Sequence, residues 1–576
     1  MDDTAGLPVS FLRGQRGMAV LALLTGVGAG LGAIAFRYMI LGFSYGFSGH
    51  RDYSSAGHAA NPLVPGLGPW FVILVPVLGG LLYGPLVSHF APEARGHGVP
   101  EVMYAVNQLG GRMRPQVPAV KSLASAICIG AGGSVGREGP IVQIGSALGS
   151  LMGQLMRLPE SQIRLLVACG AAGGISATFN APIAGVFFAL ELILRNFETR
   201  SFGLVVLSSI TADAIGRAAF GSGPFLSLPT FTFSSPLELV LYGGLGVLAT
   251  GVGLAFVRFL YGAEDLADRI WRGPAWARPA VGGLALGLLL FAVPQMYGVG
   301  YPVLEGAVAG HYVILALLGL LAAKILATSL TMAIGGSGGV FAPALFMGAM
   351  LGSAYGALAH GLAPGVAGSA GAYGLVGMGA VFAACSRAPI TAVIIIFELT
   401  GDYRIILPLM LAVVVATAVS SALTRETIYT LKLRRRGIDI EGPQPTLMGR
   451  IAVEEAMGAL PRPLSLEDPL LQVARRLADE RIDALPVLDE GGVFAGIVGA
   501  SDVERAAATA GAGLTAGSVV HSAPEIRVGQ SLEEAARALG GEDEALAVFD
   551  GEGERVVGWL THRGVLRAYA GRLDDG

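Results

Sequence analysis

Apolar segments separated by short polar ones run through the first three quarters of this 576-residue chain. Several of them are shorter than the ~20 residues that a straight transmembrane helix needs. Short apolar segments interrupted by glycine are typical of tilted, re-entrant or broken helices, which a membrane tolerates only where protein or a water-filled cavity surrounds them. The pattern predicts such helices at 18–35, 69–83, 236–257, 280–293, 311–323 and 405–423, the first within a retained span over 18–42.

The composition agrees with a chain embedded in a lipid bilayer. Hydrophobic residues make up 53% of it and charged residues only 14%, whereas a soluble protein carries ~25% charged residues. The net charge of −4 and the absence of a basic run with interleaved aromatics argue against a nucleic-acid partner. Arg13 and Arg16 before the first span and the basic stretch 431–437 after the last one place both ends in the cytoplasm of a cell-membrane protein by the positive-inside rule.

The apolar part contains an internal repeat. The segment GGSVGREGPIVQIGSALGS (132–150) matches GGSGGVFAPALFMGAMLGS (335–353) at a constant offset of 203, with nine of nineteen positions identical. Further along, APIAGVFFALEL (181–192) matches APITAVIIIFEL (388–399), and Glu191 in the first segment aligns with Glu398 in the second. Repeated membrane halves with glycine-broken helices are how many transporters build a central site.

In both copies a glycine-rich turn leads into Pro140 or Pro343 and then into a helical run. Proline suits the first helical position, because its missing N–H would have had no partner there. The free N–H groups of the turn and the positive end of the helix dipole then point into the membrane core. Two such ends predict an anion site, since a cation site would need several carboxylates or carbonyls.

Arg137 and Glu138 stand side by side in the first of these turns. A charge in the membrane core is costly and usually marks a functional pathway. A lone carboxylate at a helix N-terminus can itself act as the anion and swing away when a small anion competes or when it is protonated. Glu138 is therefore interpreted as a gate and a proton acceptor; the alternative is a structural ion pair with Arg137.

The three motifs GHGVP (96–100), GREGP (136–140) and GVFAP (339–343), together with ETIYTLKLRRRG (426–437), resemble the CLC family of chloride channels and proton–chloride exchangers. The resemblance covers the whole membrane part. It implies a polytopic α-helical membrane protein, a homodimer with one pore per subunit and two inverted-topology halves. It also implies passage of chloride or similar small anions, with no enzyme activity and no cofactor.

Carried over position by position, the resemblance makes Glu138 the external gate. It implies that backbone N–H groups around the anion come from the two later loops, and that the Tyr429 hydroxyl faces the central anion. Lys121 resembles a buried lysine that raises the local positive potential, or else it snorkels to an interface. The anion-binding set expected from the resemblance is His97, Gly98, Arg137, Gly139, Val340, Phe341, Ala342 and Tyr429.

Two positions depart from the family pattern. The first loop usually has serine, or proline in nitrate-preferring members, where this chain has His97, which either tunes selectivity and pH response or points away and packs. Proton-coupled members commonly carry two adjacent glutamates where this chain has Glu191 and Leu192. Leucine cannot carry a proton, and Glu191 is either a substitute proton carrier or a structural residue like Glu398. We therefore favour an uncoupled chloride channel, with proton–chloride exchange as the alternative.

Residues 452–576 are richer in charge and contain a second repeat. ALPVLDEGGVFAGIVGASDVERA (484–506) parallels ALAVFDGEGERVVGWLTHRGVLRA (545–568), each predicted as strand, turn, strand and helix. Apolar spacing predicts preceding helices at 468–481 and 531–540. The segment resembles a tandem pair of cystathionine-β-synthase (CBS) domains, so the fold class is a membrane domain of two inverted repeats followed by a soluble α/β CBS pair.

The nucleotide site that such domains often carry is incomplete in both copies. It needs a hydroxyl residue three positions before an aspartate that holds the ribose. The first copy has Asp502 but Gly499, and the second has Thr561 but Gly564, so a dimerising module is favoured over adenine-nucleotide binding. The expected boundaries are a cytoplasmic tail 1–12, a membrane domain 13–438 with halves 13–225 and 226–438, a linker 439–451, and CBS copies at 452–510 and 515–572.

Two other classes of protein fit less well. A cation transporter with a CBS pair predicts clustered acidic residues in the spans, whereas Glu138, Glu191 and Glu398 are scattered. A membrane-embedded enzyme needs a nucleophile or a metal-ligand set, and the eight histidines form no HExxH spacing.

Overall fold

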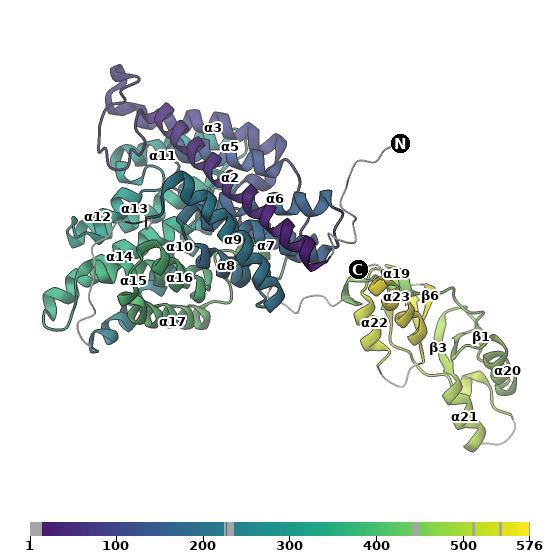
Figure 1. The fold of residues 1–576 in the computed structure, drawn as a ribbon. Coiled ribbons are helices and arrows are strands. Elements are labelled where there is room, and N and C mark those ends of the chain that lie inside the picture. Colours follow the sequence, from purple (N-terminus) through teal and green to yellow (C-terminus); the bar gives the residue numbers. More distant parts are fainter. Residues whose placement is uncertain are drawn as a thin grey trace. The chain divides into compact units, whose positions relative to one another are not determined.

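The computed structural model divides the chain into two compact units, 1–440 and 441–576, which are described separately (Figure 1). The expected tail 1–12 and most of the expected linker 439–451 lie outside the described residues, which are 14–223, 226, 236–440, 448–509, 513–540, 544–553 and 555–574.

The first unit is helical, and its two halves contain helices in matching order. The described helices of the first half are α2 (Gln15–Ser48), α3 (Phe71–Phe90), α4 (Val99–Gln108), α5 (Val117–Gly130), α6 (Glu138–Leu155), α7 (Glu160–Phe179), α8 (Pro182–Phe188), the π-helix η3 (Ala189–Leu194) and α9 (Thr199–Phe220). Those of the second half are α10 (Glu238–Ile270), α11 (Arg278–Ala292), α12 (Tyr301–Val308), α13 (Ile314–Ala333), α14 (Phe341–Leu362), α15 (Ala370–Ser386), α16 (Pro389–Thr400), α17 (Ile406–Leu423) and the short α18 (Thr430–Arg434).

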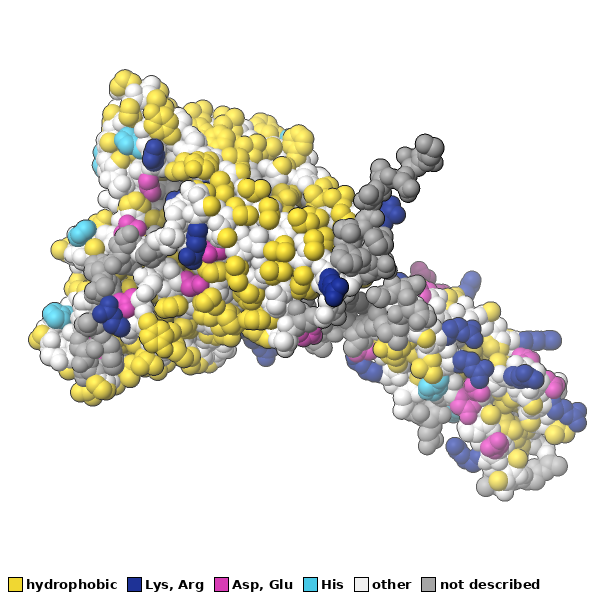
Figure 2. All heavy atoms as spheres, in the orientation of Figure 1, with side chains coloured by type: hydrophobic (Ala, Val, Ile, Leu, Met, Phe, Trp, Pro, Cys, Tyr) yellow, Lys and Arg dark blue, Asp and Glu magenta, His cyan; other side chains and the backbone are white. Residues whose placement is uncertain are grey.

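Each of the six apolar segments expected to be helical lies largely or wholly within a helix, namely α2, α3, α10, α11, α13 and α17. Among the described residues, eight helices are long and apolar enough to cross a membrane. The surface fits this, because many large apolar side chains are exposed; Leu315 on α13, for example, is 81% exposed. Figure 2 shows hydrophobic side chains spread over the visible face of this helical unit. Such a surface needs lipid around it.

Glycines bring equivalent helix pairs of the two halves into close contact. A Cβ at Gly145 of α6 would lie 2.1 Å from the carbonyl oxygen of Gly170 in α7, and one at Gly348 of α14 would lie 2.3 Å from that of Gly377 in α15. Only glycine allows backbones to approach this closely, and small residues serve the same purpose in membrane helix packing generally. Helices α6 and α14, which begin at the repeated turns, are therefore held in equivalent places by their close packing against α7 and α15.

One detail of the prediction about these turns is wrong. Helix α6 begins at Glu138 and α14 at Phe341, so Pro140 and Pro343 occupy the third helical position rather than the first. The physical argument is unaffected, because the first four N–H groups of a helix all lack an intrahelical partner and proline removes one of them.

The second unit contains two copies of one small α/β arrangement. After the short helix α19 (Val453–Ala456), the first copy has β1 (Leu464–Ser465), α20 (Leu470–Glu480), β2 (Ala484–Leu488), β3 (Phe494–Gly499) and α21 (Ala500–Thr509). The second has β4 (Ile526–Arg527), α22 (Leu532–Ala538), β5 (Ala545–Phe549), β6 (Val556–Thr561) and α23 (His562–Asp574).

In each copy the first strand pairs parallel with the second, and the second pairs antiparallel with the third. The predicted order of strand, turn, strand and helix is confirmed, as are the two preceding helices. Apolar side chains from both sheets, including Ile497, Ala547 and Trp559, form one buried cluster that joins the copies.

Candidate anion site

Three glycine-rich loops meet where α4, α6 and α14 begin. Gly136 and Gly339 exchange backbone hydrogen bonds of 2.7 and 2.6 Å, so the loops before α6 and α14 are paired. The loop before α4 joins them, because Gly96 donates to the carbonyl of Gly336 at 3.0 Å and accepts from the N–H of Gly338 at 3.3 Å. The three motifs that lie far apart in the sequence are therefore one structural site.

Glycine is required where the loops touch. A Cβ at Gly139 would lie 2.0 Å from the carbonyl oxygen of His97, which is closer than any non-bonded contact allows. Gly98 has φ +81°, a backbone conformation that side chains with a Cβ rarely adopt. The glycine spacing in GHGVP and GREGP is thus set by backbone-to-backbone contact between the loops.

A small space at this junction is enclosed by side chains and backbone of all three loops. Six predicted residues line it, and Gly98, Arg137 and Ala342 are their immediate neighbours in the chain. Two lining residues were not predicted: Val99, which stands inside the GHGVP motif, and Phe188 of α8, which no sequence pattern distinguishes from its apolar neighbours. The full lining is His97, Val99, Glu138, Gly139, Phe188, Val340, Phe341 and Tyr429.

Glu138 is 1% exposed and lies between the N-termini of α6 and α14. Its Oε2 accepts a hydrogen bond of 3.3 Å from the N–H of Ala342, and its Oε1 accepts one of 2.8 Å from the hydroxyl of Tyr301. Arg137 donates to the carbonyl of Thr178 at 3.4 Å, and its guanidinium carbon lies 5.3 Å from the ring centre of Tyr301. A carboxylate thus occupies the place where free N–H groups converge.

His97 is fully buried, and its ring centre lies 6.0 Å from that of Tyr429. Its Nε2 lies 3.4 Å from the hydroxyl oxygen of Tyr261, a residue of α10 that donates its own proton to the carbonyl of Ile428 at 2.5 Å. The ring therefore lies beside Tyr429 and Tyr261, and a role of His97 in selectivity or pH response stays a prediction.

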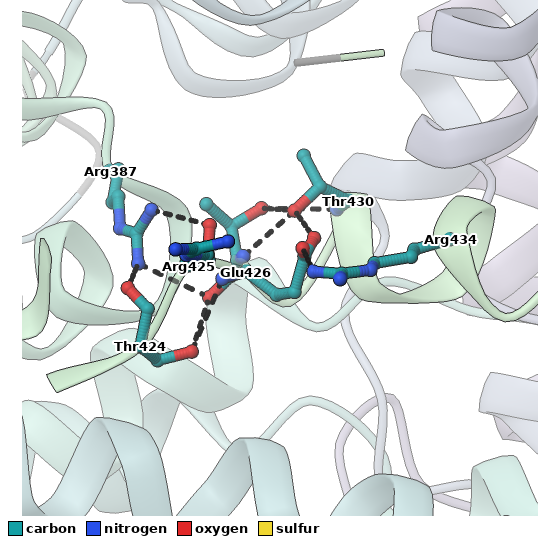
Figure 3. Close-up of polar contacts among 7 residues, drawn as sticks. Arg387, Thr424, Arg425, Glu426, Thr430 and Arg434 are labelled. Carbon is teal, nitrogen blue, oxygen red and sulfur yellow. Dashed lines mark hydrogen bonds and ion pairs between the residues drawn. The ribbon is translucent and has the colours of Figure 1, made fainter. Parts of the chain in front are cut away.

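Tyr429 is 1% exposed, and residues on both sides of it in the chain form a network of polar contacts. Figure 3 shows these contacts among Arg387, Thr424, Arg425, Glu426, Thr430 and Arg434. Arg387, at the end of α15, donates to the carbonyls of Thr424 and Arg425, the latter at 2.8 Å. Glu426 accepts from the hydroxyl of Thr430 at 2.8 Å and pairs with Arg434. These contacts anchor the segment that carries Tyr429 at the start of α18.

Two lysines are completely buried near the loops. Lys121 of α5 donates to the carbonyls of Ala94 and Gly96 at 2.8 Å each, so it does not snorkel to an interface. Lys324 of α13 donates to Ser134 Oγ and to the carbonyl of Val299, both at 3.0 Å. Lys324 was not predicted as a site residue, although it stands at the repeat offset of 203 from Lys121.

Glu191 and Glu398 cap helices of opposite halves. Glu191 accepts from the N–H groups of Ile390 and Thr391 at 3.1 and 2.9 Å, at the start of α16. Glu398 accepts from the N–H groups of Ile183 and Ala184 at 3.0 and 2.7 Å, at the start of α8. Leu192 is buried beside Glu191 at 6% exposure.

In the second unit, the predicted nucleotide residues lie at the starts of α21 and α23. Asp502 accepts from the N–H of Gly499 at 2.9 Å and lies 3.1 Å from Nδ1 of His521. Glu544 accepts from the N–H groups of Ala500 and Ser501 at 2.8 and 3.2 Å. The N-terminus of α21, where a phosphate would bind, is therefore occupied by the chain's own carboxylate.

In the second copy, the N–H of Gly564 donates to Thr561 Oγ1 at 3.2 Å. This threonine therefore caps the start of its own helix.

Comparisons with known proteins agree with this architecture. A family model described as voltage gated chloride channel matches residues 79–421, and a CBS domain model matches residues 455–509. A putative chloride channel protein, ClcB-like, from Ralstonia nicotianae is 36% identical over 426 residues, which are 73% of this chain and 98% of the relative. An H(+)/Cl(−) exchange transporter, ClcA, from Cronobacter sakazakii is 34% identical, covering 72% of this chain and 89% of the relative.

Solved structures show the same fold. The crystal structure of a slow cyanobacterial Cl−/H+ antiporter superimposes with a TM-score of 0.64 at 27% identity, over 75% of this chain and 99% of that one. The structure of a eukaryotic CLC transporter superimposes with a TM-score of 0.63 at 21% identity, over 96% of this chain and 98% of that one, which shows the fold alone. The matched family model, the relatives and the three joined loops show that the chain belongs to the CLC family of membrane transport proteins and carries a C-terminal CBS region.

Proposed function

We propose that this protein exchanges chloride for protons across a membrane, with Glu138 as the gate. The observation that carries the proposal is the position of the Glu138 carboxylate, which accepts the N–H of Ala342 at the start of α14 while it stands at the start of α6. A chloride ion needs the same N–H groups. Carboxylate and chloride therefore compete for one place.

Protonation decides this competition. An ionised Glu138 is held by the helix N-termini, and a neutral carboxyl is held far less strongly because the charge that the N–H groups stabilise is gone. The neutral side chain then leaves the place to chloride. Since the carboxyl takes up a proton to leave and releases one to return, chloride movement and proton movement are linked at this residue.

Relatives named as exchangers support coupling over the uncoupled channel that we favoured from the sequence. ClcA of Vibrio parahaemolyticus, an H(+)/Cl(−) exchange transporter, is 35% identical over 356 residues, which are 61% of this chain and 76% of the relative. The structure at 27% identity is also that of a Cl−/H+ antiporter.

An uncoupled chloride channel is the second candidate, and Leu192 favours it. This aliphatic side chain cannot carry a proton, and it stands where proton-coupled members of the family commonly have a glutamate. The ClcB-like relative from Ralstonia nicotianae bears the name of a putative channel.

The remaining roles belong to the same proposal. His97, Tyr429 and the N–H groups of Gly139, Val340 and Phe341 surround the anion, and Lys121 adds positive potential from its place behind the first loop. The protein works as a homodimer with both ends in the cytoplasm. The CBS pair serves as a dimerising module rather than a nucleotide sensor. The contact that argues against nucleotide binding is that of Glu544, which caps the helix start that a nucleotide phosphate would need.

The deciding experiment uses purified protein in liposomes under a chloride gradient, with the external pH recorded. An exchanger moves protons uphill as chloride runs down its gradient. Chloride flux without proton movement, at a reversal potential set by chloride alone, would make the protein a channel. The leucine at position 192 would then explain why no protons move.

The gate has its own test in the variant Glu138→Gln, which mimics the protonated carboxyl. Chloride flux is expected to be equal to wild type or faster, and to become independent of pH. A folded variant without chloride flux would contradict the gate assignment.

A further inference from the structure

The hydroxyl of Tyr301 donates a hydrogen bond of 2.8 Å to Oε1 of Glu138. Tyr301 is the first residue of α12 and follows Gly300, whose φ of +87° turns the chain sharply into the helix. The bond joins α12 to the start of α6, across 163 residues of sequence. No anion-binding motif of the family resemblance includes this tyrosine.

The loop before Tyr301 is fixed by the buried Lys324. The ammonium group of Lys324 donates to the carbonyls of Val299 and Gly298 at 3.0 and 3.4 Å, and to Ser134 Oγ at 3.0 Å. Ser134 lies in the loop that leads to Glu138. The buried Lys324 side chain thus ties together the two loops that carry the tyrosine and the glutamate, and this fixes the tyrosine hydroxyl relative to the carboxylate.

The internal repeat gives this loop a counterpart on the anion path. The sequence GVGYP (298–302) mirrors GHGVP (96–100), and Lys324 mirrors Lys121. Lys121 fixes the first anion loop through the carbonyls of Ala94 and Gly96. Both halves therefore contain a glycine loop fixed by a buried lysine. In the second half the loop carries Tyr301 at the position that Val99 has in the first.

We propose that Tyr301 is a positioning residue that holds the ionised carboxylate of Glu138 in the anion path and thereby sets the pH at which the gate releases. This rests on the proposed role of Glu138 as the gate. A hydroxyl that donates to a carboxylate stabilises the charged form, so more acid is needed to neutralise it. The other charged or titratable groups around Glu138 are Arg137 beside it, Lys324 from α13, and His97 and Tyr429, which line the same space.

The test is the pH dependence of chloride flux from liposomes that contain the full chain, for wild type and Tyr301→Phe. The substitution removes one oxygen atom and keeps the ring. Loss of a hydrogen bond to a charged group is expected to move the pH of half-maximal flux upward by about one to two units. Chloride flux at neutral pH rises accordingly.

Tyr297→Phe is the matched control. Tyr297 is buried in the same stretch of chain, and its hydroxyl donates to the carbonyl of Gly130 at 2.7 Å rather than to Glu138. This variant is expected to keep the wild-type pH profile. A Tyr301→Phe profile that coincides with wild type, or that moves to lower pH, would overturn the proposal.

A double variant separates failure of this proposal from failure of the gate itself. If Glu138→Gln abolishes pH dependence, adding Tyr301→Phe to it is expected to change nothing further. If Glu138→Gln leaves the pH profile intact, the gate assignment is wrong, and the role proposed for Tyr301 is wrong as well. If Glu138→Gln flattens the profile while Tyr301→Phe alone leaves it unmoved, only the role of Tyr301 is wrong.

Discussion

Replacing Glu191 by glutamine separates the two alternatives for this residue, a proton carrier and a helix cap. Its carboxylate accepts three hydrogen bonds, from the N–H groups of Ile390 and Thr391 and from Thr391 Oγ1 at 2.6 Å. Both oxygens are engaged, and both face donors at the N-terminus of α16. This geometry favours the cap.

The magnitude follows from the number of donors. Glutamine has one acceptor oxygen, and its NH2 group would face an N–H group, so at least one donor loses its partner. An unsatisfied polar group costs about 1–3 kcal/mol. Since Glu191 is partly exposed and water can replace part of the lost contact, we expect Glu191→Gln to lower the free energy of unfolding by about 1–2 kcal/mol.

Glu398→Gln is the matched control, because Glu398 caps α8 in the same way through Ile183 and Ala184. Thermal unfolding of detergent-purified protein is expected to show a similar loss for both variants. In liposomes, both are expected to move as many protons per chloride as wild type. Loss of proton movement in Glu191→Gln alone, with chloride flux retained, would refute the cap and place Glu191 on a proton route.

Two further substitutions test the loops and the tail. Gly139→Ala places a Cβ 2.0 Å from the His97 carbonyl, which is expected to cost about 1–3 kcal/mol and to abolish chloride flux, whereas Gly243→Ala, with open space around it, is expected to leave flux unchanged. Ser531→Ala removes the capping box of α22, in which Ser531 and Glu534 bond each other's backbone N–H, and is expected to speed hydrogen exchange in α22 by the equivalent of about 1 kcal/mol. The hydrogen bonds from Ser531 lower the pKa of the Glu534 carboxyl, so their stabilisation is present at neutral pH and is lost as the pH falls through that lowered value. Hydrogen exchange in α22 that does not change with acid, after correction for intrinsic rates, would contradict the last prediction.

Much of the fold could be predicted because its signals are local. A span of apolar residues has to form a helix in lipid, since its backbone groups have no other partners, and this gave α2, α3, α10, α11, α13 and α17. The alternation of strand and helix in residues 452–576 could be predicted for the same reason. The place of Pro140 was missed because any of the first helical positions tolerates proline, so the residue alone does not fix where a helix begins.

The missed site residues divide into two kinds. Lys324 and the GVGYP loop of Tyr301 could have been predicted by extending the internal repeat. Lys324 stands at the offset of 203 that relates the anion loops, and GVGYP stands 202 residues after GHGVP (298 − 96). Phe188 and Tyr261 had no such signal. Each is an ordinary aromatic residue in an apolar helix, and nothing in its neighbours along the chain shows which loop it will meet.

The sequence by itself determined the membrane-spanning class, the repeat and the loops of N–H groups, because hydropathy and glycine spacing act over a few residues. Only the tertiary structure decided which groups meet. The bond between Tyr301 and Glu138 spans 163 residues, and the caps formed by Glu191 and Glu398 cross from one half of the repeat to the other. Such contacts depend on how the two halves pack against each other, and that packing is a property of the whole fold.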